Sequence, residues 1–65
     1  MNTNLERGVR IFLADDHPAV REGLTLRLLQ EGFVVCGEAE NRAMLLAGID
    51  ASRSDIALVD LTLCG

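Results

Sequence analysis

The sequence predicts an α/β fold built around a parallel sheet, and two observations lead to this prediction. Short, nearly continuous apolar runs alternate with longer segments of helical periodicity, in the order β-α-β-α-β. Strands that are separated by helices pair in parallel through right-handed crossovers. The 65 residues are enough for one small domain at most, and a domain of this size is only marginally stable.

Three segments are predicted to be strands: residues 9–14 (VRIFLA), 33–39 (FVVCGEA) and 55–60 (DIALVD). All three are short and rich in apolar or β-branched side chains. The first run in particular is typical of a strand that is buried on both faces. Gly37 lies inside the second run, where a packing reason is favoured over a functional close approach.

The first predicted helix spans residues 18–31 (PAVREGLTLRLLQE). Pro18 suits the first helical position, Asp16 or His17 can cap the helix, and Gly32 is a good stop signal. The helix carries an apolar stripe at four-residue spacing that is widened by one neighbour. This stripe consists of Val20, Leu24, Leu28 and Leu29.

The second predicted helix spans residues 41–52 (NRAMLLAGIDAS) and is opened by Asn41. Its apolar side is expected to hold Leu45, Leu46 and Ile49. The polar residues 1–8 are interpreted as a flexible leader, and residues 9–65 as the domain that contains all the predicted strands and helices.

The composition argues against several functional classes. Six basic and ten acidic residues give a net charge of −4, which argues against a nucleic-acid surface in this piece. Phe12 and Phe33 are the only aromatic residues, so base-stacking platforms are lacking. Cys36 and Cys64 are not at a metal-ligand spacing, and free thiols are favoured over a disulfide. Without a signal-type or membrane-length apolar run, the expected location is the cytoplasm, with no membrane partner.

Acidic residues end two of the predicted strands. Asp15 and Asp16 follow the first strand, and Asp60 ends the third. Because the carboxyl ends of parallel strands lie at one edge of the sheet, where ligands bind, these side chains are expected to converge. Neighbouring carboxylates repel one another unless a cation neutralises them, and all-oxygen ligands select a hard ion such as Mg²⁺. A carboxylate beside Mg²⁺ can attack a phosphoryl group and form an acyl phosphate.

A structural interpretation competes with this one, since acidic residues at strand ends often serve as helix caps and turn formers. Either the Asp15–Asp16 pair or Asp60 alone would favour capping, whereas their combination at one edge favours a metal site. His17 could be a metal ligand or a proton donor, but a solvated loop residue near a helix start is the favoured interpretation.

Three stretches, in order, resemble the start of a response-regulator receiver domain: VRIFLADDHPAVREGLTLRLLQ, VVCGEAEN and DIALVDLTLCG. The run ADDHPAVREGL and the GEA of the second strand are typical of the NarL/FixJ-like subgroup, which carries a LuxR-like DNA-binding domain. The resemblance covers nearly the whole chain from Val9 onward. It implies the β-α-β-α-β first half of a flavodoxin-like, doubly wound parallel sheet.

By this resemblance Asp60 is the phosphoacceptor, Asp16 contacts Mg²⁺ directly, Asp15 acts mainly through water, and the backbone carbonyl of Thr62 is a further metal ligand. The phosphoryl donor is expected to be a phosphohistidine on a sensor histidine kinase, and the output to be control of transcription. The chain is then a phosphoacceptor and not an enzyme, apart from self-catalysed phosphotransfer. It would reach DNA only through an output domain that these residues do not include.

The chain departs from the family pattern at three positions. Cys64 and Ser54 stand where Pro is usual, and Arg42 stands where Gly is usual. Residues 9–65 correspond to a partial receiver domain, because family members continue through two more strands. These strands end in the Ser or Thr that senses the phosphoryl group and in a Lys that pairs with it.

As the last strand of this piece, residues 55–60 are expected to form an exposed edge, which is a template for pairing with another chain. The piece is therefore expected to belong to a longer protein or to form a homodimer by antiparallel pairing across a two-fold axis. An alternative function is a truncated, non-switching receiver fragment that acts as a dimerisation or binding module. A small Mg²⁺-dependent phosphatase is a weaker interpretation, because such enzymes usually place a second acid where Thr62 stands.

Overall fold

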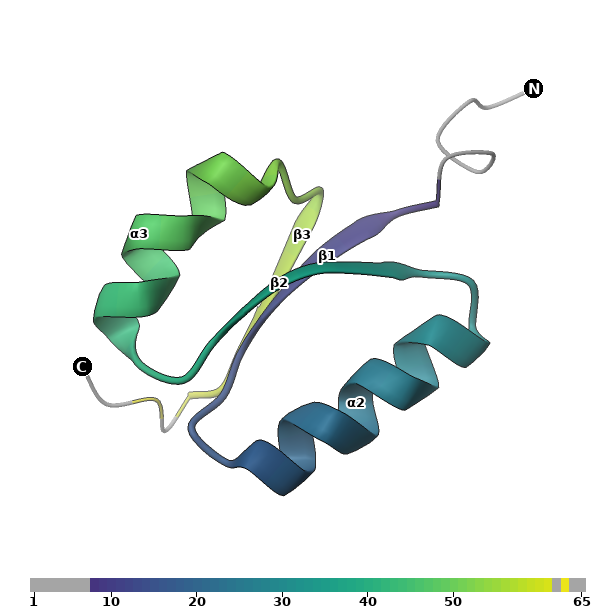
Figure 1. Ribbon diagram of the computed structural model, residues 1–65, viewed down its shortest axis with the longest axis horizontal. Helices are drawn as coiled ribbons and strands as arrows, with labels where there is room; N and C mark the ends of the chain where they lie inside the picture. Colours follow the sequence, from purple (N-terminus) through teal and green to yellow (C-terminus); the bar gives the residue numbers. More distant parts are fainter. Residues whose placement is uncertain (1–7, 62, 64–65) are drawn as a thin grey trace.

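The computed structural model describes residues 8–61 and residue 63. Within this part the chain forms β1 (Arg10–Ala14), α2 (Pro18–Gln30), β2 (Val34–Ala39), α3 (Arg42–Ser52) and β3 (Ile56–Val59) (Figure 1). The predicted order β-α-β-α-β is confirmed. The predicted leader up to residue 7, the Thr62 carbonyl and Cys64 lie outside the described residues.

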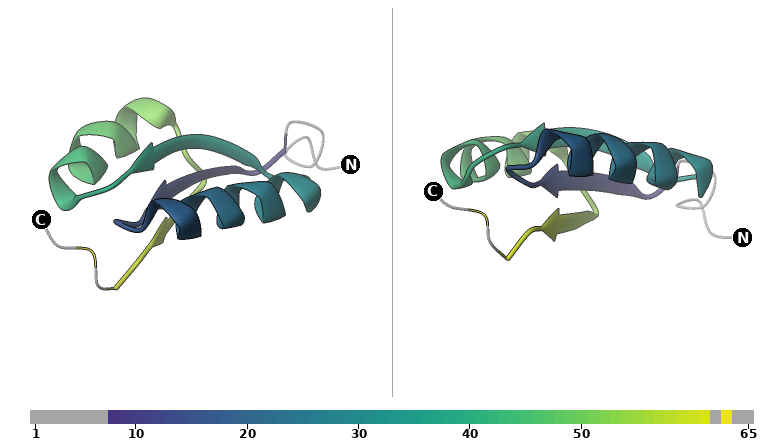
Figure 2. Two further views of the ribbon diagram at one scale, coloured as in Figure 1. Left: turned by 60° about the horizontal axis from the view of Figure 1, so that its bottom comes forward. Right: turned by 90° about the horizontal axis from the view of Figure 1, so that it is seen from below.

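The three strands form one parallel sheet in the order β2-β1-β3, with β1 in the centre. This order is compatible with the first three strands of a flavodoxin-like sheet. The two helices lie on opposite faces of the sheet, which Figure 1 shows nearly edge-on and Figure 2 shows from two further sides. Because the strands are parallel, the loops that follow β1 and β3 leave the sheet at the same edge.

The core is centred on β1, because this strand has a neighbouring strand on either side and α3 packs against it. Its buried apolar residues are Ile11, Phe12, Leu13 and Ala14, and β2 adds Ala39. The expectation that residues 9–14 contain a strand buried on both faces is confirmed. Cys36 packs against the edge of this core and, within the described residues, is a free thiol, as favoured from the sequence.

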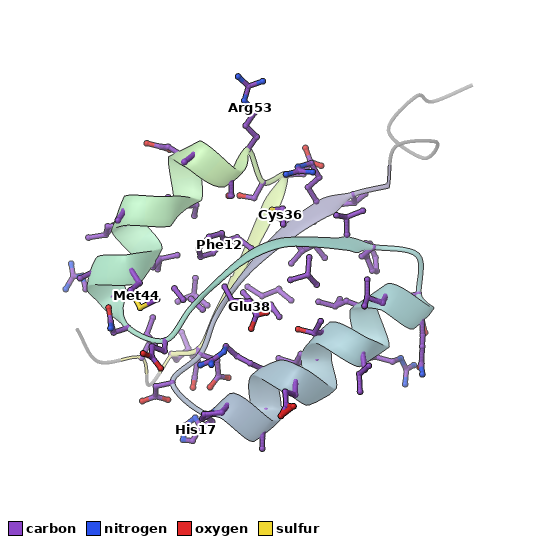
Figure 3. All side chains as sticks on the ribbon, viewed as in Figure 1. Phe12, His17, Cys36, Glu38, Met44 and Arg53 are labelled. Carbon is purple, nitrogen blue, oxygen red and sulfur yellow. The ribbon has the colours of Figure 1, made fainter. Side chains whose placement is uncertain are left out.

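Gly37 lies directly against the Phe12 ring, which Figure 3 shows on the α3 side of the sheet. A Cβ atom added at Gly37 would lie 2.7 Å from Phe12 Cε2, and one added at Gly48 of α3 would lie 3.3 Å from the same atom. The ring is thus held between two backbones at glycine positions. The packing reason predicted for Gly37 is confirmed.

A shift in register brings Gly37 to this position. Ile11 pairs with Val35, whereas the next residue, Phe12, pairs with Gly37, so Cys36 is an extra residue on β2. An extra residue on one strand is the mark of a β-bulge, and it changes which β2 residue lies opposite each β1 side chain. The bulge places a glycine rather than a cysteine opposite the aromatic ring.

Local signals at the helix ends act in part as predicted. Pro18 is the first helical residue of α2, and His17 occupies the N-cap position, but the His17 side chain makes no capping hydrogen bond. The side chain of Asn41 caps α3 by accepting a hydrogen bond of 2.9 Å from the Met44 N–H. Gly32 has a φ of +91°, a conformation that favours glycine, and it directly follows the C-cap residue of α2.

The apolar sides of the helices differ in part from the prediction. Every residue of α2 is at least partly exposed, and Leu29 is 54 % exposed. The reason is that α2 packs mainly against the edge strand β2. On α3, Leu45 packs against the core, but Leu46 is 65 % exposed. The assignment of Leu46 to the apolar side was wrong, because the next residue on a helix is rotated by about 100°.

β3 is an exposed edge of the sheet within the described residues, as expected. All of its residues are exposed, including the large apolar side chains of Ile56, Leu58 and Val59. Its backbone pairs with β1 on one side, through the register Ile11–Ile56 to Ala14–Val59.

Candidate functional site

Backbone hydrogen bonds bring the two acidic strand ends together. The Asp60 N–H donates to the Ala14 carbonyl at 2.9 Å, and the Asp15 N–H donates to the Ala39 carbonyl at 3.0 Å. Asp60 therefore leaves β3 beside the point where β1 ends, as the parallel-sheet rule predicts. The expected convergence of the carboxylates at one edge is present in the structure.

The side chains at this edge form a cluster that includes a histidine. One ligand atom from each of Asp15, Asp16, His17 and Asp60 lies within 4.8 Å of the others. His17 Nδ1 is 3.0 Å from Asp15 Oδ1, 2.8 Å from Asp16 Oδ1 and 3.6 Å from Asp60 Oδ2. We call these four residues the acidic cluster.

The members of the acidic cluster differ in exposure. The Asp15 side chain is 11 % exposed, whereas those of Asp60 and Asp16 are 23 % and 39 % exposed. Asp15 is therefore the anchored member, and its Oδ1 also accepts a hydrogen bond of 2.8 Å from the His17 N–H. Asp60 can be reached from solvent, which a residue that reacts with an incoming group requires.

His17 is more than the solvated loop residue favoured from the sequence. Its side chain is 60 % exposed, but its Nδ1 atom lies within 3.6 Å of a carboxylate oxygen from each of Asp15, Asp16 and Asp60. The hydrogen bond to Asp15 and the negative charge of Asp16 raise the pKa of the imidazole above its ordinary value of 6.5. Its position directly after the Asp15–Asp16 pair, with Pro18 fixing the next turn, is the sequence signal for this placement.

Arg21 is a second residue that sequence reasoning missed. Its Nη1 donates to the Asp15 carbonyl at 2.6 Å, and its Nε donates to Glu38 Oε1 at 3.2 Å. Glu38 lies on the α2 side of β2 (Figure 3), next to Ala39. Arg21 thus joins α2, β2 and the end of β1 behind the acidic cluster.

The donor set fits a divalent cation with a preference for oxygen ligands. At a Mg²⁺–oxygen distance of about 2.1 Å, two ligands on opposite sides of the ion are about 4.2 Å apart. The ligand atoms of the acidic cluster, His17 Nδ1 included, lie within 4.8 Å of one another, which is slightly more than this span. Asp15, Asp16 and Asp60 would hold the ion, while the predicted fourth ligand, the Thr62 carbonyl, lies outside the described residues.

Beside the acidic cluster lies an open groove between α2 and β3. Apolar side chains line most of it, and Asp15, His17 and Asp60 line its end. The apolar lining comes from Leu13, Ala14, Val20, Leu24, Leu58 and Val59. Within the described residues, no helix is both long and apolar enough to cross a membrane.

Comparison with known proteins relates the chain to transcriptional regulatory proteins. It is 43 % identical over 58 residues to the transcriptional regulatory protein NarL of Mycobacterium tuberculosis. The matched segment covers 88 % of this chain and 27 % of that protein. It is 41 % identical over 56 residues to the DNA-binding transcriptional activator DevR/DosR of the same species, 85 % of this chain and 26 % of that protein.

A third relative is the transcriptional regulatory protein YdfI of Bacillus subtilis, which is 38 % identical over 53 residues, 80 % of this chain and 25 % of that protein. No family model and no solved structure matches the chain. The chain spans about a quarter of the length of the curated relatives that it matches. These similarities support the resemblance to response regulators at the level of the family.

Proposed function

We propose that this chain is the phosphoacceptor part of a two-component response regulator. In this proposal Asp60 accepts a phosphoryl group from a sensor histidine kinase in a Mg²⁺-dependent reaction, and the phosphorylated protein controls a transcriptional output. The observation that carries the proposal is the meeting of Asp15, Asp16 and the partly exposed Asp60 at the carboxyl edge of a parallel sheet. The transcriptional-regulator names of the relatives support the output.

Asp60 is suited to act as the nucleophile. One of its carboxylate oxygens attacks the phosphorus atom of a phosphohistidine, so that a P–O bond forms and the P–N bond breaks. The electron pair of the broken bond goes to the imidazole nitrogen of the kinase, which takes up a proton. The Asp60 backbone is held by the hydrogen bond from its N–H to Ala14, so the attacking group starts from a fixed position.

Asp15 and Asp16 hold the cation in this proposal. Asp16 is the more exposed of the two and would be the direct ligand, while the anchored Asp15 would act mainly through water. Bound Mg²⁺ would supply positive charge that offsets the charge on the transferring phosphoryl oxygens. Kinase binding, self-catalysed phosphotransfer and a location in the cytoplasm belong to the same proposal, and DNA binding would lie in a separate output domain.

The exposed edge of β3 favours a second candidate function. Ile56, Leu58 and Val59 are each at least 40 % exposed on a strand whose backbone is available for pairing. In this alternative the chain is a non-switching module that pairs with another chain through β3, as a homodimer or with a full-length regulator.

An intact-mass measurement after incubation with Mg²⁺ and acetyl phosphate tests the proposed function. The 7.0 kDa chain should gain the mass of one phosphoryl group. Asp60→Asn should abolish the gain, whereas Asp50→Asn, which changes an exposed carboxylate on α3, should leave it intact. An unlabelled wild-type chain would favour the interaction module, and labelling that persists in Asp60→Asn would refute Asp60 as the acceptor.

A further inference from the structure

Arg21 is attached to the acidic cluster through the main chain and not through a carboxylate. Its Nη1 donates to the carbonyl oxygen of Asp15 over 2.6 Å, a short hydrogen bond with a charged donor. This carbonyl belongs to the peptide unit that joins Asp15 to Asp16. Because the peptide unit is planar, a bond that fixes its oxygen also fixes the direction in which the chain enters Asp16.

The same stretch of backbone is also bonded directly to β2. The Asp15 N–H donates to the Ala39 carbonyl at 3.0 Å. The two peptide units that flank Asp15 are therefore tied to different elements, one to β2 and one to the first turns of α2. Together these bonds determine where the Asp15 and Asp16 side chains start.

The guanidinium of Arg21 is itself preorganised. Its side chain is 18 % exposed, and its Nε donates to Glu38 Oε1 at 3.2 Å. Glu38 directly precedes Ala39, the residue that accepts from the Asp15 N–H. A planar guanidinium can donate in two directions at once, whereas a lysine ammonium is a point charge on a flexible stem. Arg21 therefore reaches the Asp15 carbonyl from a position that β2 defines.

From this geometry we infer that Arg21 is a positioning residue that sets the spacing of the Asp15 and Asp16 carboxylates and thereby the affinity of the acidic cluster for a divalent cation. The inference rests on the proposed function, because it assigns a role toward the cation of that site. Residues that orient metal ligands from outside the coordination sphere change metal affinity by about 10–100-fold when they are replaced.

The test compares Arg21→Met with two control variants by a Mg²⁺ titration of the amide chemical shifts. Arg21→Met should weaken Mg²⁺ binding by about tenfold. Glu38→Gln removes the ion pair of Arg21 but keeps the donor to the Asp15 carbonyl, so its affinity should stay within about twofold of wild type. Arg27→Met removes an arginine from the same helix, one that pairs with Glu31 in solvent, and should leave the affinity unchanged.

A metal-free measurement separates positioning from general stabilisation. The His17 N–H donates to Asp15 Oδ1, so its hydrogen exchange reports whether the Asp15 side chain is held. Arg21→Met should speed this exchange, relative to amides of β1, whereas Arg27→Met should not. If Arg21→Met does not fold, Arg21→Gln replaces it. The shorter glutamine side chain cannot bring a donor to the position of Nη1, so its Mg²⁺ affinity should also fall.

Three results would overturn the inference. One is a folded Arg21→Met, or Arg21→Gln in its place, with wild-type Mg²⁺ affinity. Another is a loss of affinity in Glu38→Gln as large as that in Arg21→Met, which would assign the effect to the ion pair. A wild-type chain that neither binds Mg²⁺ nor accepts a phosphoryl group would contradict the proposed function and the inference with it. If wild type is phosphorylated, the first or the second of these results contradicts the inference alone.

Discussion

Replacing Gly37 by alanine tests whether the β2 backbone must lie directly against the Phe12 ring. The new Cβ atom would sit 2.7 Å from Phe12 Cε2 and 2.8 Å from Cδ2, which are closer than ordinary contacts. The ring cannot withdraw freely, because Phe12 is 3 % exposed and Gly48 of α3 lies behind it. Overpacking of this kind lowers the free energy of unfolding by about 1–3 kcal/mol.

The assay is thermal and urea unfolding followed by circular dichroism. In a small domain, each kcal/mol of lost stability lowers the thermal midpoint by about 4–8 °C. The midpoint of Gly37→Ala should therefore fall by at least that amount. Gly23→Ala is the matched control, because a Cβ atom there would meet no described atom within 4 Å and the residue lies inside α2. That control should stabilise the protein by up to about 1 kcal/mol.

A second substitution tests whether the loss of stability comes from the contact between residue 37 and the Phe12 ring. Phe12→Leu removes the ring that the new methyl group would strike, so Gly37→Ala should cost less in the Phe12→Leu background than in the wild type. A Gly37→Ala protein as stable as wild type, or equal costs of Gly37→Ala in both backgrounds, would refute the proposed contact.

Three other predictions follow from the described contacts. In the metal-free protein the His17 pKa should exceed 6.5. Its interaction with the carboxylates then stabilises the fold fully below pH 6.5, and this stabilisation is lost as the pH rises through the raised pKa. An NMR titration of the imidazole measures the pKa, and an unshifted value contradicts the prediction. Asn41→Ala should cost about 1 kcal/mol, because the Met44 N–H loses its acceptor; urea unfolding should show a lower midpoint with an unchanged slope. Leu58→Lys on β3 should reduce self-association of the chain, and equal sedimentation of variant and wild type at several concentrations would argue against pairing through this edge.

Most of the fold was predictable because its signals are local. Apolar runs of strand length, the proline at the start of α2, the capping Asn41 and the glycine after α2 each act through neighbouring residues. The meeting of Asp15 with Asp60 was predictable as well, although they are 45 positions apart in the sequence. That prediction needed only the rule that the carboxyl ends of parallel strands share one edge.

The face that each helix presents was less predictable. Leu46 is as apolar as Leu45, yet only Leu45 packs against the core. Helical periodicity defines a stripe, but where the stripe ends depends on how far the sheet extends beneath the helix.

By itself, the sequence determined the α/β class, the order of the elements and the gathering of acidic residues at one edge of the sheet. The tertiary structure alone decided that His17 turns its Nδ1 toward three carboxylates, that Arg21 holds the Asp15 carbonyl, and that a bulge brings Gly37 under the Phe12 ring. These features depend on side-chain directions and on register between strands. Neither is encoded in the spacing of residue types along the chain, because both are set by how separate elements pack.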